Sequence, residues 1–122
     1  MQPFTVNSLM DQMALALDAG EPARANHVKQ VLLAAVSQRD WLPPDRRTAN
    51  HQNYARHLLH ADPAGRFSVL SIVWSPGQMS PVHGHHTWCA VGVIKGEIEE
   101  TFFDLPGGQD APMQRHCATR GV

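Results

Sequence analysis

The sequence has 122 residues, 43% of them hydrophobic, and a formal net charge of -1 at pH 7. This length favours one domain of ordinary globular composition. The near-neutral charge, with lysines and arginines in no block, argues against a nucleic-acid or anionic-membrane partner. No apolar run approaches the roughly 20 residues that cross a bilayer, and no basic start precedes an apolar core. We therefore expect no membrane span, no signal peptide and a cytoplasmic location.

The first 50 residues are predicted to be helical. Residues 23–38 carry apolar side chains with the spacing of one helix face, at Val28, Val31, Leu32, Ala35 and Val36. A shorter stripe with similar spacing lies upstream, at Leu9, Met10, Met13 and Leu17. Two helices are therefore expected, with Gly20 as the stop between them.

Short strands are predicted after the helical part, which Pro43 and Pro44 end because neither can continue a helix. Residues 67–74 and 88–95 are rich in β-branched and aromatic side chains. Gly96 indicates a tight turn, after which residues 97–104 should pair back as a hairpin. One weaker strand is expected over residues 113–119. The predicted fold is α+β in a single domain, with residues 1–50 helical and residues 51–122 forming an antiparallel sandwich or barrel.

Histidines cluster at His83-Gly84-His85. Residues i and i+2 of an extended chain face the same side, so two imidazoles can bind one divalent metal there. Neutral imidazole suits iron, zinc, nickel and copper alike, and ligand type alone does not choose the metal. Taken alone, the pattern fits an ordinary solvent-facing histidine pair about equally well.

The flanking spacing is more specific than the histidine pair. Five residues separate Gly77 from His83, three separate His85 from Cys89, and six separate Cys89 from Gly96. This pattern resembles the first cupin motif, G-x5-HxH-x3/4-E-x6-G, with Cys89 in place of the glutamate. The two glycines are expected to close turns on either side of the histidines.

Cysteine at that position is a mark of the cysteine dioxygenases among the cupins, and the chain resembles this family over residues 53–107. The stretch Tyr54-Ala55-Arg56-His57-Leu58 resembles the family's Tyr-x-Arg-Asn-Leu, and His85-His86-Thr87-Trp88 is similar to the bacterial members. The resemblance implies an antiparallel cupin (jelly-roll) barrel. It also implies an Fe(II)-dependent thiol dioxygenase that oxidises L-cysteine with O2 to cysteine sulfinic acid.

Roles for single residues follow from the resemblance. His83 and His85 would be two of three iron ligands, and Tyr54 would lie near the substrate. Arg56 would hold the substrate carboxylate, which agrees with the bidentate fit between a guanidinium and a carboxylate. The related 3-mercaptopropionate dioxygenases tend to have glutamine there, so Arg56 favours L-cysteine. Cys89 matches a cysteine that is cross-linked to tyrosine in animal enzymes, whereas bacterial members usually have glycine.

The chain departs from the family where the third histidine is expected, because the sequence ends before the second cupin motif. The predicted strands are also fewer than the about eight of a small closed barrel. Three explanations stay open: the chain is a fragment, a second copy supplies strands, or the third ligand is His86 or His116.

Each site residue also has a purely structural interpretation. Arg56 could be a surface arginine, Tyr54 a core residue and Cys89 a small buried hydrophobe. Solvent exposure is expected for three further histidines, His51, His57 and His60. The alternative functions are a dioxygenase for 3-mercaptopropionate or another small thiol, and an inactive cupin fragment that binds a metal or ligand without turnover.

Overall fold

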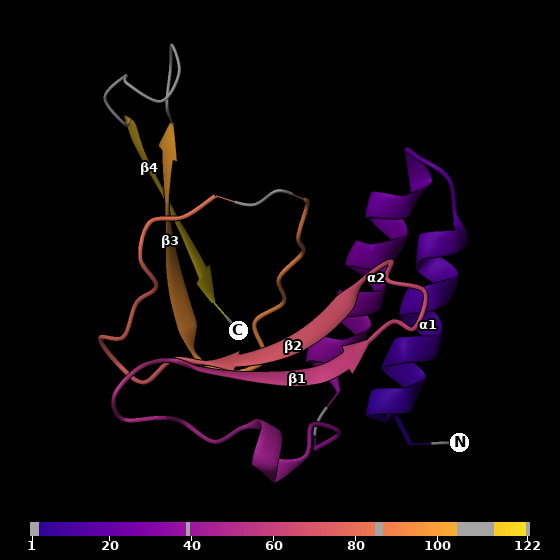
Figure 1. Cartoon of the computed structure of the whole chain (residues 1–122), viewed down its shortest axis with the longest axis horizontal. Coiled ribbons are helices and arrows are strands. Elements are labelled where there is room, and N and C mark those ends of the chain that lie inside the picture. The colour runs from indigo at the N-terminus through magenta and orange to yellow at the C-terminus, as the bar shows by residue number, and fades with distance from the viewer. Residues whose placement is uncertain (1–2, 39, 85–86, 105–113, 122) are drawn as a thin grey trace. The chain divides into compact units, whose positions relative to one another are not determined.

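The computed structural model describes residues 3–38, 40–84, 87–104 and 114–121, and for 102–104 and 114–121 it describes the backbone alone. The elements in chain order are α1 (Val6–Asp18), α2 (Ala23–Ser37), the 3-10 turn η1 (Pro44–Arg46), β1 (Ala55–Ala61), β2 (Ser68–Val73), β3 (Glu97–Asp104) and β4 (Gln114–Gly121) (Figure 1). This order of helices followed by strands confirms the α+β prediction. The chain divides into two compact units, Met1–Pro81 and Val82–Val122. The single domain stays a prediction.

The helical pair forms the core of the first unit. Thr5 caps the start of α1: its hydroxyl accepts a hydrogen bond from the Ser8 amide while the Ser8 hydroxyl accepts one from the Thr5 amide, both 3.1 Å long. These bonds satisfy two amide groups that the helix itself leaves without acceptors. The apolar stripes of both helices meet in one cluster of buried residues, Leu9, Met10, Met13, Ala16, Val28 and Ala35. Both predicted helices are thereby confirmed.

The β1–β2 hairpin has one face on this core and one open face. Its antiparallel register runs from Ala55 opposite Val73 to Ala61 opposite Ser68. Phe67 and Val69 pack against the helical core. Figure 1 shows the hairpin beside the two helices. On the other face Leu58 and Ile72 remain 54% and 40% exposed. The predicted strand over residues 67–74 is confirmed, and the open face of the hairpin also carries Arg56, which lies opposite Ile72.

The second unit corrects one predicted hairpin. β3 pairs with β4 over the whole length from Glu97 opposite Gly121 to Asp104 opposite Gln114, which confirms both of these predicted strands. Residues 88–95, however, form no strand, and β3 does not pair back across Gly96. The positive φ of 84° at Gly96 gives the expected bend without the expected pairing. A β-rich composition becomes a strand only where a neighbouring strand pairs with its backbone groups, and composition alone does not supply that partner.

The described strands form two separate two-stranded sheets, β1–β2 and β3–β4. The cupin barrel therefore stays a prediction that the family resemblance carries. Within the described part of the chain, neither helix has the length and apolarity needed to cross a bilayer.

Arg66 connects the turn of the β1–β2 hairpin to the end of α1. Its Nε donates to Asp62 Oδ2 at 2.9 Å, and its Nη1 donates to Asp18 Oδ1 at 3.0 Å. The Arg66 amide also donates to Asp62 Oδ2, at 3.1 Å. The side-chain hydrogen bond from Arg66 is the main reason that the pKa of Asp62 lies below its ordinary value.

We expect Asp62→Asn to destabilise the folded chain at neutral pH and to lose this effect in acid. The folded-state pKa of Asp62 is lowered, so the contribution of its carboxylate to stability is fully present above the unfolded value of about 3.9. It is then lost as the pH falls through the lower folded value. Chemical denaturation of both proteins from neutral to strongly acidic pH measures the difference in unfolding free energy. Asp45→Asn is the matched control, since this carboxylate pairs with its exposed chain neighbour Arg46. If the difference in unfolding free energy between wild type and Asp62→Asn persists unchanged in acid, the ionised Asp62 carboxylate is not what stabilises the fold.

Candidate active site

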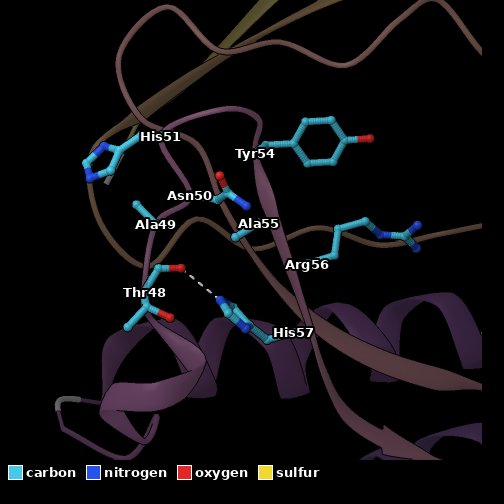
Figure 2. Close-up of a pocket in the computed structure, with 8 residues that line it drawn as sticks. All are labelled: Thr48, Ala49, Asn50, His51, Tyr54, Ala55, Arg56 and His57. Carbon is cyan, nitrogen blue, oxygen red and sulfur yellow. Dashed lines mark hydrogen bonds between the residues drawn. The ribbon is translucent and has the colours of Figure 1, made fainter.

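Tyr54 and Arg56 share one open pocket of about 520 Å³ in the first unit. Tyr54 directly precedes β1 and Arg56 is its second residue, and alternate residues of an extended chain face the same side. Figure 2 shows their two side chains extending in the same direction. Residues 48–51 line the pocket together with residues 54–57. The structure thus brings together two of the site residues that the sequence predicts.

The two residues differ in how firmly they are held. The Tyr54 ring stacks on Trp74 with centroids 5.7 Å apart and an interplanar angle of 28°, so packing fixes its orientation. Arg56 lies opposite Ile72 in the hairpin and is exposed. Within the described ranges its guanidinium makes no hydrogen bond or ion pair, whereas Arg24, Arg46 and Arg66 each pair with a carboxylate. Its donors are therefore available for a ligand, which is what a carboxylate-binding arginine requires.

Two of the three histidines expected at the surface are half-buried, so that prediction is wrong for them. The Nε2–H of His57 donates to the Thr48 carbonyl at 2.9 Å, and His60 lies 5.8 Å from the Phe67 ring centroid. His51 is exposed, as predicted, and lines the pocket. Residues 48–51 form a pocket wall that the sequence does not predict, because nothing in their composition indicates that they fold back beside β1.

The predicted iron ligands belong to the second unit. His83 is exposed, and His85 and His86 lie outside the described residues. For His116 the structure gives the backbone position alone, opposite Phe102. No three His, Cys, Asp or Glu side chains of the described ranges come together as a metal-binding group. The iron site therefore stays a prediction, supported by the chemistry of the His-x-His donors.

Cys89 is exposed, and the interpretation of it as a small buried hydrophobe is wrong. Its neighbours Trp88 and Val91 are also 55% and 61% exposed. The reason is the missing strand: residues 88–95 have no sheet in which one face could be buried. The proposed place of Cys89 in an active site stays a prediction.

Comparison with known proteins decides the family. The family model described as cysteine dioxygenase type I matches residues 4–120. The chain belongs to the cysteine dioxygenase type I family. Similar curated proteins include cysteine dioxygenase type 1 of Rattus norvegicus and of Mus musculus, each 27% identical over 108 residues, which is 87% of this chain and 52% of the relative. Cysteine dioxygenase type 1 of Danio rerio is 30% identical over 69 residues, which is 56% of this chain and 32% of the relative.

The chain spans about half the length of the mammalian cysteine dioxygenases and a smaller share of the fish protein. The family match extends well beyond the region of resemblance noted in the sequence, residues 53–107, and includes α1 and α2. The helical core that supports the β1–β2 hairpin is therefore part of the cysteine dioxygenase type I match.

Proposed function

We propose that the chain acts in the oxidation of L-cysteine by O2 to cysteine sulfinic acid, as an iron-dependent thiol dioxygenase. The observation that carries this proposal is the pocket in which Arg56, with no ion pair to any described carboxylate, lies beside the stacked Tyr54. A small thiol that also bears a carboxylate fits this pair of side chains, and family membership supports the reaction type.

Arg56 would bind the substrate carboxylate through two parallel N–H donors. Charge-assisted hydrogen bonds of this kind contribute about 1.5–3 kcal/mol. The Tyr54 hydroxyl would supply a further hydrogen-bonding group beside the substrate, and the stacking on Trp74 limits the motion of its ring. Holding the carboxylate end restricts the positions of the thiol end, which is the entropic part of the catalytic effect.

His83 and His85 would hold Fe(II), which when bound supplies the redox chemistry between O2 and a thiol. Both imidazoles are neutral ligands, so they leave the positive charge of the site uncompensated and favour a thiolate over a thiol. In the overall reaction the sulfur loses four electrons and the two oxygen atoms of O2 take them up, both becoming part of the sulfinic acid. The reaction therefore balances without a further co-substrate.

A comparison of three thiols tests the proposed carboxylate contact. L-cysteine should be oxidised at least about tenfold more efficiently than cysteamine, because cysteamine lacks the carboxylate that Arg56 would pair with. O2 consumption and product mass give kcat/KM for each thiol. A preference for 3-mercaptopropionate over L-cysteine would keep the reaction and change the substrate. Equal efficiency with cysteamine and L-cysteine would remove the carboxylate contact from the proposal.

A further inference from the structure

Side chains from the hairpin and from the turn after it hold the backbone of residues 46–50, which we call the strap. The accepting groups are carbonyls of alternate strap residues. The bonds are Ser71 Oγ to Arg46 O at 2.6 Å, His57 Nε2 to Thr48 O at 2.9 Å, and Gln78 Nε2 to Asn50 O at 2.6 Å. The strap begins with Arg46, the last residue of η1, and runs on to Asn50, so the three bonds fasten it at its start, its middle and its end.

The three donors occupy fixed positions of the first unit. His57 is on β1 and Ser71 is on β2, where the two residues are directly opposite each other. Gln78 follows β2 in a turn. Its side-chain Oε1 accepts a hydrogen bond from the Ser75 backbone N–H at 2.8 Å, and its backbone N–H donates to the Ser75 carbonyl at 3.0 Å. Because each donor is itself held by paired or turn backbone, the strap is fixed relative to the hairpin.

The strap also lines the pocket of Tyr54 and Arg56. Thr48, Ala49 and Asn50 contribute its wall. Figure 2 shows His57 directed toward Thr48, whereas the preceding Arg56 extends elsewhere. Two consecutive residues of β1 thus have different tasks: Arg56 is the proposed carboxylate anchor, and His57 makes the bond to the strap.

We propose that His57 is a positioning residue: by holding the Thr48 carbonyl it keeps the strap against β1 and sets the width of the pocket for a small thiol acid. The link to substrate rests on the proposed function, while the fastening of the strap does not. His57 acts through the strap and does not touch the reacting atoms. Its loss should therefore weaken substrate binding more than it slows the reaction of bound substrate.

Limited trypsin digestion tests the fastening directly, because the strap begins with Arg46 and Arg47. His57→Leu removes the donor and should speed cleavage there by about fivefold, since proteolysis follows the population of locally opened chain. His57→Gln supplies an amide donor in its place and should restore slow cleavage. Cleavage after Lys29, inside α2, reports global unfolding and serves as the internal reference. His60→Leu is the matched control, since His60 is on the same strand and contacts Phe67.

Strap cleavage in His57→Leu that matches the wild-type rate would overturn the fastening, whatever the activity. So would equal acceleration by His60→Leu, or a failure of His57→Gln to restore resistance. If His57→Leu does not fold, Ser71→Ala removes the neighbouring bond to the Arg46 carbonyl with a smaller change and should accelerate the same cleavage.

Kinetics test the link to the pocket. His57→Leu should raise KM for L-cysteine about fivefold and leave kcat within about twofold, and His57→Gln should recover the wild-type KM. An unchanged KM with a loosened strap would overturn the positioning role.

If no protein, wild type included, oxidises L-cysteine, the proposed function fails. In that case the positioning role is tested by the affinity of the iron-free chain for L-cysteine. The affinity is measured by anaerobic titration, followed through the backbone amide NMR signals of residues 55–57. Weaker binding by His57→Leu supports the positioning role, and equal binding or no binding refutes it.

Discussion

His83→Ala is expected to lower thiol-dependent O2 consumption by about 100-fold or more, because the substitution removes one of the two imidazoles proposed to hold Fe(II). Loss of groups that merely orient metal ligands already costs about 10- to 100-fold in metal affinity or activity, and loss of a ligand should cost at least as much. The measurement is O2 uptake with L-cysteine, together with the iron content of the purified protein.

The matched control for this variant is His27→Ala. His27 is exposed on α2 in the first unit and has no place in the proposed site. It should leave both iron content and O2 uptake near the wild-type values. Wild-type iron content and activity in His83→Ala would mean that the His-x-His pair does not form the iron site.

Arg56→Gln is expected to raise KM for L-cysteine by about 10- to 100-fold, which corresponds to the about 1.5–3 kcal/mol of a charge-assisted pair. Arg56→Lys should recover only part of this loss, because an ammonium keeps the charge but not the planar pair of donors. The same substitution should change the reaction of cysteamine little, since cysteamine has no carboxylate to lose. Steady-state kinetics with both thiols measures the two effects side by side.

Lys29→Gln is the control for Arg56→Gln. Lys29 is an exposed cation on α2 and lies outside both the strap and the pocket lining. If Arg56→Gln and Lys29→Gln alter KM equally, the effect of Arg56 is one of general charge. If Arg56→Gln impairs cysteamine as strongly as L-cysteine, Arg56 does not act on the carboxylate.

The helices could be predicted from the sequence because their signal is local. Leu9 and Met13 are four residues apart on α1, and Val28 and Ala35 are seven apart on α2, so each pair lies on one helix face. All four are buried in the same cluster. The prediction of a strand over residues 88–95 was wrong for the opposite reason. The local composition favours an extended chain, but a strand also needs a neighbouring strand to pair with, and no local pattern specifies that neighbour.

In the candidate site, too, the features with a local sequence signal could be predicted and those that depend on distant contacts could not. The alternation of Tyr54 and Arg56 follows from strand geometry once a strand is assumed, and the structure places both residues on one pocket. The strap was missed because its contacts are distant in sequence: Ser71 reaches back 25 residues to Arg46, and Gln78 reaches back 28 to Asn50. Side-chain bonds to backbone carbonyls over such separations leave no periodic trace in the sequence.

The most direct test of thiol dioxygenation by this chain is its reconstitution with Fe(II) without oxygen, followed by addition of L-cysteine and air. O2 consumption and cysteine sulfinic acid are measured together, the latter by mass spectrometry. Sulfinic acid should accumulate in an amount equal to the O2 consumed. Bound iron with no O2 uptake, or uptake without sulfinic acid, would contradict the proposal that this chain carries out thiol dioxygenation.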